Sequence, residues 1–285
     1  MMKKAFLFLA VALTAVACQK EAVCDDSCKI VRFDVNGDFT SPVFSYGETR
    51  AGLSADGSEM TDLWLLDYMD GELVQTVHQT PADTDWGSPS VSLAFGSHVV
   101  YFVASRGDSP VLSTESKTIE WSRVSDTFWK AEAVNIDATT SASRSVTLGR
   151  VATRLRLVVN DKVPDAAASV VITPQHWYYG VNYVTGEPVA DRQEDRVVNI
   201  PQSYKGTEGQ LAVSIFGISG ADEWTTDVTV SSRDADNDIM GRAVIISVPF
   251  KRNRVTEYSG NLFSAGGGMS VTLNDTWEQS YTGTW

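Results

Sequence analysis

The chain has 285 residues, of which 43% are hydrophobic and eight are tryptophans, so it can bury a large core in one or two domains. Its formal net charge is −13, with 36 acidic against 23 basic residues and no basic stripe along the sequence. Such a surface repels the phosphates of nucleic acids and excludes them as partners.

The first 17 residues have the composition of a secretory signal peptide. Lys3 and Lys4 precede an apolar run over 5–13, and small residues occupy 15–17. The apolar run is too short to span a bilayer as a helix. We therefore predict export with removal of residues 1–17, which takes away two lysines and lowers the formal charge to −15.

The three cysteines of the chain follow at once, as Cys18, Cys24 and Cys28. The run "AVAC" resembles the lipobox at which bacterial lipoproteins are cut and acylated, although Ala15 stands where Leu is usual. We predict that Cys18 carries acyl chains such as palmitate, which hold the protein on the outer membrane. A plain signal peptide followed by a chance cysteine is the alternative. Residues 18–29 then form a lipidated tether, in which the other two cysteines either form a disulfide or stay free.

Beyond the tether, almost every periodic segment alternates apolar and polar residues in short runs separated by Gly, Asn, Asp and Pro. This pattern predicts an all-β protein built from β-sandwiches, with little helix except a short turn over 164–169. We expect Val91, Leu93 and Phe95 in one core, and Leu155, Leu157 and Val159 in another. The clearest strands are expected at 31–35, 91–95, 98–105, 152–159, 210–219, 225–230, 242–250 and 269–273.

The strand series runs twice along the chain. We therefore predict an N-terminal sandwich over 30–148 and a C-terminal sandwich over 149–285, each near the usual size of such a domain. The join falls where a polar Ser/Thr stretch over 139–145 gives way to the strongly alternating run "ATRLRLVV". The linker is short, so we expect the two domains to pack closely.

The sequence contains no nucleophile motif, no phosphate-binding glycine loop and no paired metal ligands among its three scattered histidines. We therefore expect no enzymatic activity, no cofactor and no metal. The run "DADND" at 234–238 begins like a calcium loop, but Ile239 and Ile245 stand where that loop needs Gly and Glu. A solvated hairpin turn is the favoured interpretation.

An aromatic stretch, "HWYYGVNYVTG" at 176–186, has two interpretations. Alternation puts Trp177, Tyr179, Val181 and Tyr183 on one face. If that face met water, the rings would form a platform on which sugars stack. Because aromatic residues dominate sandwich cores, a buried face is favoured.

Several pieces together resemble the fimbrillin superfamily of Bacteroidales, which includes FimA/Mfa-like pilus subunits and FimB/Mfa2-type anchor lipoproteins. They are the lipobox at Cys18, "ETRAGL" (48–53) ahead of "TDLWLLDY" (61–68), "LGRVATRLRLVV" (148–159) and "VPFKRNRVTEYSGNLF" (248–263). The resemblance implies two tandem transthyretin-like β-sandwiches in a lipid-anchored surface protein. It also implies a structural or adhesive role as stalk, tip or anchor of a fimbria.

In polymerising members of that superfamily, a trypsin-like protease cuts after an arginine and removes the lipidated segment with its first strand. A strand from a neighbouring subunit then fills the groove. Arg50 is the residue that matches, and an ordinary exposed loop arginine is the alternative. Other fimbrial subunits, the outer membrane and a host protein or glycan are the partners that follow. The alternative function is that of a lipid-anchored glycan-binding protein of a sugar-uptake system.

The last ten residues, "TWEQSYTGTW", point Trp277, Tyr281 and Trp285 to one side when extended. A terminal segment without a structural role is usually polar. We therefore predict that this segment docks as a strand, either into its own domain or into the groove of the next subunit.

Overall fold

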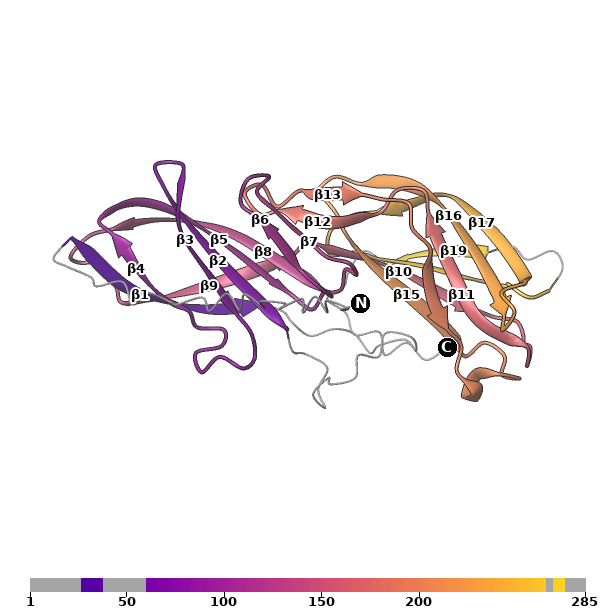
Figure 1. The fold of residues 1–285 in the computed structure, drawn as a ribbon. Coiled ribbons are helices and arrows are strands. Elements are labelled where there is room, and N and C mark those ends of the chain that lie inside the picture. The colour runs from indigo at the N-terminus through magenta and orange to yellow at the C-terminus, as the bar shows by residue number, and fades with distance from the viewer. Residues whose placement is uncertain (1–26, 38–59, 265–268, 275–285) are drawn as a thin grey trace, which may run out of the picture.

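The computed structural model describes residues 27–37, 60–264 and 269–274. Strands make up most of this part of the chain, and its only helical element is the short 3-10 turn η1 (Gln202–Tyr204). Figure 1 shows an elongated body with one β-sandwich at each end and a small sheet between them. This arrangement confirms the all-β fold expected from the alternating sequence.

The first sandwich consists of seven strands in the order β3-β2-β5-β8-β9-β1-β4. This order folds into two layers because β9 pairs with β8 at only two positions and then runs parallel to β1 over six. The buried residues of both layers form one core. The strands are β1 (Cys28–Gly37), β2 (Asp62–Met69), β3 (Glu72–Gln79), β4 (Ser90–Ala94), β5 (Gly96–Ser105), β8 (Thr127–Ile136) and β9 (Ser143–Arg150).

The second sandwich packs two four-stranded sheets, in the orders β15-β10-β18-β19 and β14-β11-β16-β17. Its first strand, β10, runs parallel to β18, as β1 runs parallel to β9 in the first sandwich. The two halves thus repeat one topology. The strands are β10 (Ala152–Val159), β11 (Ala167–Pro174), β14 (Arg196–Asn199), β15 (Leu211–Ile218), β16 (Trp224–Asp234), β17 (Ile239–Phe250), β18 (Val255–Gly260) and β19 (Met269–Asn274).

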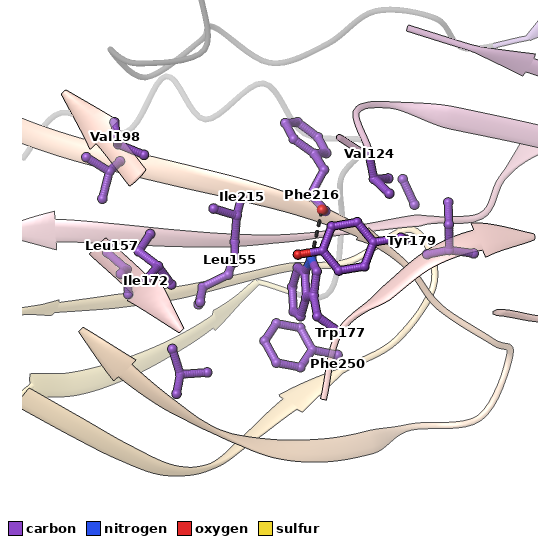
Figure 2. Close-up of a cluster of buried hydrophobic side chains, with 14 of the residues drawn as sticks. Val124, Leu155, Leu157, Ile172, Trp177, Tyr179, Val198, Ile215, Phe216 and Phe250 are labelled. Atoms are coloured by element: carbon purple, nitrogen blue, oxygen red, sulfur yellow. Dashed lines mark hydrogen bonds between the residues drawn. The ribbon is translucent and has the colours of Figure 1, made fainter. Parts of the chain in front are cut away.

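Figure 2 shows the centre of the second core, where aromatic rings meet the aliphatic residues of β10 and β15. Trp177 packs edge-on against Phe250 with ring centroids 5.0 Å apart, and its indole nitrogen donates to the carbonyl of Phe216 at 2.9 Å. The ring lies directly over Gly217, where an added Cβ would come within 2.7 Å of the indole. A side chain at this position would therefore displace the ring.

A third, small sheet joins the two halves. Its order is β13-β12-β7-β6, with β6 (Val111–Ser113), β7 (Thr118–Glu120), β12 (Tyr178–Asn182) and β13 (Pro188–Asp191). The hairpin β6–β7 comes from the first half of the chain and pairs with β12 of the second half. This pairing crosses the domain boundary predicted at 148/149. It was not predicted, because the sequence pattern of a strand does not indicate a pairing partner far away in the chain.

Each of the predicted strands overlaps an observed one, and β10 has the predicted bounds 152–159. Val91, Leu93, Leu155, Leu157 and Val159 are at most 3% exposed, which confirms their place in the two cores. Phe95 is only partly buried, because it occupies the single position between the end of β4 and the start of β5.

The expected helical turn over 164–169 is wrong. The amide of Ala167 donates to the carbonyl of Pro164 at 3.1 Å, which closes one turn, and β11 begins at Ala167. Sheet pairing of β11 with β16 satisfies the backbone from there onward, so the run of alanines extends as a strand.

Strand β2 reads as a continuous apolar run because both of its faces are covered. Leu63 and Leu65 belong to the first core, whereas Trp64, Leu66 and Tyr68 belong to the second. The Tyr68 hydroxyl lies 2.8 Å from the Tyr183 hydroxyl, a hydrogen bond between the two halves of the chain. The two sandwiches therefore share an apolar contact in addition to the small sheet.

A buried ionic cluster lies where the first sandwich passes into the second. The Asp126 carboxylate accepts hydrogen bonds from Arg150 at 2.7 and 3.1 Å and from Arg106 at 3.3 Å. All three side chains are at most 3% exposed. Arg150 also donates to Asn253 of the second half at 3.2 Å. The end of β9 is thereby fixed to both halves.

We predict that Leu157→Ala lowers the free energy of unfolding by about 2–5 kcal/mol, because it removes buried methyl groups and leaves a cavity. Val244→Ala on β17, where the side chain is 55% exposed, is the control and should change it by less than about 0.5 kcal/mol. Urea unfolding followed by fluorescence measures both. Equal effects of the two substitutions would contradict the assignment of Leu157 to the core.

We predict that Asp126→Asn lowers the free energy of unfolding by about 3–5 kcal/mol, because it removes the charged carboxylate that two buried guanidinium groups share. The matched control is Asp222→Asn at an exposed position. Urea titration of both variants is the measurement. A loss below about 1 kcal/mol would mean that the cluster does not hold the junction.

Candidate strand-exchange site

Strand β1 lies within the first sandwich with a neighbouring strand on each side. It pairs antiparallel with β4 over Cys28–Arg32 and parallel with β9 over Arg32–Gly37. Backbone hydrogen bonds of 2.9 Å from the amides of Phe33 and Val35 continue the first ladder along the chain before β4. Its removal would open a groove with unpaired backbone groups on both walls.

The inner face of β1 fills the centre of the first core. Val31 and Phe33 are 0% exposed, and the Phe33 ring packs edge-on against Phe102 with centroids 5.3 Å apart. Burying each side chain stabilises the strand by about 1.5–3 kcal/mol. The same core includes Val91, Leu93, Val146 and Leu148 from the two flanking strands.

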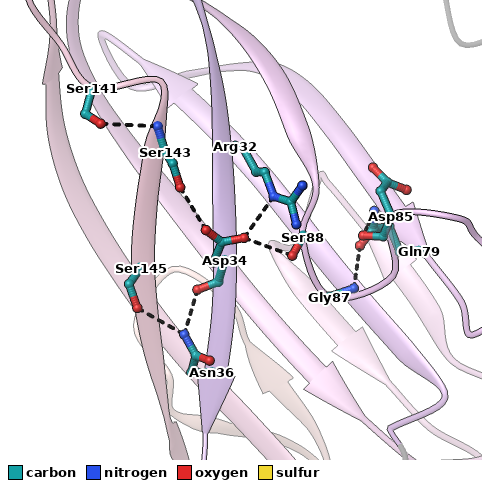
Figure 3. Close-up of polar contacts among 10 residues, drawn as sticks. All are labelled: Arg32, Asp34, Asn36, Gln79, Asp85, Gly87, Ser88, Ser141, Ser143 and Ser145. Atoms are coloured by element: carbon teal, nitrogen blue, oxygen red, sulfur yellow. Dashed lines mark hydrogen bonds and ion pairs between the residues drawn. The ribbon is translucent and has the colours of Figure 1, made fainter.

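The outer face of β1 is held by one carboxylate, drawn in Figure 3. Asp34 accepts hydrogen bonds from Ser143 of β9 at 2.8 Å, from Arg32 at 2.9 Å and from Ser88 before β4 at 3.0 Å. These bonds lower the pKa of Asp34 below its usual value, and the bond from Ser143 contributes most to the shift. The group therefore links β1 to both walls of the groove while it is ionised.

Two more side chains attach β1 to β9 and to the segment that precedes it. The Asn36 amide donates to Ser145 at 3.0 Å, and the Lys29 ammonium donates to the carbonyl of Ala138 at 3.1 Å. Both contacts are exposed. Strand β1 is thus held by apolar contacts on its buried face and by solvent-exposed hydrogen bonds on its outer face.

Most of the predicted site residues lie outside the described residues: Cys18, Cys24, Arg50, Trp277, Tyr281 and Trp285. Cys28 is described, begins β1 and is disulfide-bonded to a residue outside that part of the chain. Its pairing with Cys24 stays a prediction.

The role of Asp34 was not foreseen from the sequence. The alternation of "VRFDV" does place Arg32 and Asp34 on the face opposite Val31 and Phe33. The partners, however, are Ser88 and Ser143, and only a fold that brings distant serines beside β1 can identify them.

The aromatic stretch around β12 faces the core. Trp177, Tyr179, Val181 and Tyr183 are each 0% exposed, which confirms the favoured interpretation. This face therefore offers no stacking platform to a sugar. Burial raises the pKa of Tyr183 well above its usual range, with a further contribution from the hydrogen bond to Tyr68.

The run at 234–238 forms the hairpin turn between β16 and β17, as predicted. One Asp234 oxygen accepts from the amides of Asp236 and Asp238, at 3.0 and 2.9 Å. That oxygen thus closes an Asx turn. In the described part of the chain, no group of three or more His, Cys, Asp or Glu residues is placed to hold a metal ion. Within the same ranges, no helix has the length and apolar character needed to cross a bilayer.

Several solved structures of proteins from Bacteroides and Parabacteroides species share this fold, although sequence identity is low. A candidate adhesin from Bacteroides ovatus matches with a TM-score of 0.53 at 14% identity, covering 87% of this chain and 96% of its own. A candidate polysaccharide-binding protein (DUF1812) from Bacteroides thetaiotaomicron has a TM-score of 0.52 at 11% identity, covering 88% and 99%. A fimbrial assembly protein from Parabacteroides distasonis has a TM-score of 0.51 at 10% identity, covering 88% and 100%. The fold expected from the fimbrillin resemblance is thereby confirmed.

The chain belongs to the family of unknown function DUF6562, whose pattern matches residues 110–284. The match begins at the hairpin β6–β7. It therefore covers this hairpin together with the second half of the chain, where its pairing partner β12 lies. No curated protein matches the chain.

We predict that Asp34→Asn speeds amide exchange over β1 at neutral pH, because it removes the ionised acceptor shared by three donors. The folded-state pKa of Asp34 is lowered, so its contribution is present above the pKa of an unfolded Asp, about 4, and is lost as the pH falls through the folded value. The difference between variant and wild type should therefore shrink below about pH 4.

Hydrogen exchange followed by mass spectrometry, with both proteins compared at each pH, tests this. The matched control is Asp161→Asn. Burial raises the pKa of Asp161, but three backbone amides at 262–264 outweigh it and lower the pKa overall. That substitution should loosen residues 262–264 and leave β1 unchanged. Equal exchange over 28–37 in wild type and Asp34→Asn at pH 7 would contradict the role given to Asp34.

Proposed function

We propose that this chain is a subunit of a surface fimbria, with a structural or adhesive role. The observation that carries the proposal is the place of β1, an N-terminal strand inserted between two others and held by noncovalent contacts along its length. Such a strand can be exchanged for an equivalent strand of another chain, because the groove supplies the same backbone partners. The fold shared with adhesins and a fimbrial assembly protein supports this assignment.

Processing at Arg50 would release β1. All three cysteines precede residue 29, so any disulfide of Cys28 within the chain lies on the released side of such a cut. After the cut, no covalent bond of the chain would hold the segment that contains β1. Its loss would expose the pocket of Phe33 and the unpaired edges of β4 and β9.

The donor strand in this proposal is the C-terminal segment of another copy, with Trp277, Tyr281 and Trp285 as its anchors. It follows β19, the edge strand of its sheet, which pairs only with β18 among the described residues. Alternate side chains of the donor would enter the groove, as Val31 and Phe33 do now.

Before processing, we propose that Cys18 is acylated and holds the protein on the outer membrane, facing the cell exterior. A stalk or tip subunit would lose this anchor together with β1, whereas an anchor subunit would keep both. The other predicted function, a glycan-binding protein of a sugar-uptake system, loses its main support because the rings of 177–183 are buried.

We predict that cleavage after Arg50, by an arginine-specific protease in limited digestion, converts the exported chain from monomer to oligomers. The new N-terminus should be Ala51. Arg50→Gln should stay monomeric under the same treatment. Light scattering coupled to size exclusion measures the oligomers.

Deleting residues 276–285 separates the two docking possibilities. If the segment is a donor strand, the cleaved variant should keep its thermal transition but stay monomeric. If the variant loses its thermal transition, the segment belongs to its own domain and the exchange proposal is wrong in this respect.

A further inference from the structure

A cavity of about 600 Å³ opens beside the small sheet that joins the two sandwiches. Its volume falls within the range of about 300–1,000 Å³ typical of small-molecule sites. The side chains that carry the argument are Asp70, Ser97, Tyr101, Lys117, Asn135 and Val184.

The floor of this junction pocket is the outer face of β5 and β8. Val99 and Tyr101 alternate along β5 with Val100 and Phe102, which point into the first core. The floor is therefore a rigid sheet surface rather than a loop. Ala133 and Asn135 continue the same face on β8.

The walls of the junction pocket come from two tight turns in which the chain adopts left-handed backbone angles. Asp70 (φ 53°) and Gly71 (φ 84°) form the turn between β2 and β3. Lys117 (φ 58°) lies just before β7, in the hairpin that belongs to the small sheet. Because that hairpin pairs with β12, the wall is fixed by both halves of the molecule.

Tyr101 gives the junction pocket a partly exposed aromatic ring. The ring is held edge-on by Tyr68, with centroids 5.5 Å apart, and it also packs against Tyr183 at 6.1 Å. Tyr68 and Tyr183 are in turn locked by their shared hydrogen bond. Burial raises the pKa of Tyr101, so its hydroxyl keeps its proton and can donate.

The polar groups of the junction pocket retain hydrogen-bonding capacity. In the described part of the chain, neither the Asp70 carboxylate nor the Lys117 ammonium has an ion-pair partner within 4 Å. The Ser97 hydroxyl meets the Asn135 oxygen at 3.4 Å, which leaves the amide protons of Asn135 for another acceptor. One carboxylate and one ammonium balance each other, so the pocket favours a neutral ligand.

We propose that the junction pocket binds a short neutral saccharide. A sugar ring has an apolar C–H face and a rim of hydroxyls that both donate and accept. The apolar face fits Tyr101, Val99 and Val184, and the rim fits the carboxylate, the amide and the ammonium. A polyanionic glycan is disfavoured by the charge of −13 on the whole chain.

This site is separate from the strand-exchange site. The junction pocket faces outward from the β2–β5–β8 layer, while β1 lies in the opposite layer with the first core between them. The inference therefore does not depend on polymerisation, and it assigns the adhesive contact to residues that strand exchange leaves untouched. Binding can be tested on the uncleaved monomer, so failure of one proposal leaves the other standing.

The test is isothermal titration calorimetry of the uncleaved chain with maltotriose, N-acetyllactosamine and di-N-acetylchitobiose. At least one should bind, and Asn135→Ala and Asp70→Asn should each weaken that binding by up to about tenfold, as expected for the loss of one hydrogen bond. Asp70→Asn suits the turn because Asn also tolerates the left-handed conformation. The matched control, Asn199→Ala on the exposed surface of β14, should bind as the wild type does.

Tyr101→Phe removes the hydroxyl and retains the ring, so it should weaken binding less than Asn135→Ala. The proposal is overturned if none of the three saccharides binds at 10-millimolar concentrations, on the order of the weakest specific affinities. Binding that is unchanged in both Asn135→Ala and Asp70→Asn overturns it too. Preferential binding of an extended tripeptide, trialanine, would identify the junction pocket as a peptide site instead.

Discussion

The buried carboxylate of Asp126 determines where the first sandwich ends, because it binds the guanidinium groups of Arg106 and Arg150. Arg150 is the last residue of β9, and β10 begins two residues later. The position of β9 in turn fixes the parallel ladder with β1 and places Ser143 beside Asp34. A buried ion pair contributes little net stability compared with apolar residues of the same shape, but it strongly penalises any arrangement that separates the charges. The strand-exchange site thus depends on a cluster in another part of the same sandwich.

The two halves share a topology in which the first strand runs parallel to a later one, β9 in the first half and β18 in the second, but the proposed exchange involves only the first half. In the second half, β10 is joined to β9 through Val151 and is 0–7% exposed at Leu155, Leu157, Val158 and Val159. Releasing it would break the chain at the ionic junction. Strand β1 is joined to β2 through residues 38–61, which include Arg50, so the proposed cut would separate β1 from the rest of the sandwich. If β1 is exchanged as proposed, the same topology supplies a permanent core strand in the second half and a removable strand in the first.

Local periodicity was sufficient to place eight of the strands, since alternation indicates which face of a sheet is buried. It identified "ATRLRLVV" with correct bounds and the aromatic face of β12 as core. It did not identify the hairpin β6–β7 as a partner of β12, nor Ser88 and Ser143 as partners of Asp34, because these contacts join residues far apart in the chain. The run "DLWLLDY" is buried on both faces, but its sequence does not indicate which half of the molecule covers each face.

The hairpin β6–β7 links the two sandwiches. It pairs with β12, carries Lys117 to the edge of the β2–β5–β8 layer and places Ile119 in the same core cluster as Trp64 and Leu66 of β2. Leu63, Trp64, Leu65 and Leu66 make β2 apolar on both faces, whereas polar groups line the cavity at the other end of the strand. Because the floor, the hairpin and the Tyr68–Tyr183 contact come from both halves, a ligand in the cavity would bridge the sandwiches. Binding there would add contacts between the two halves and leave β1 untouched, because the first core lies between the cavity and β1.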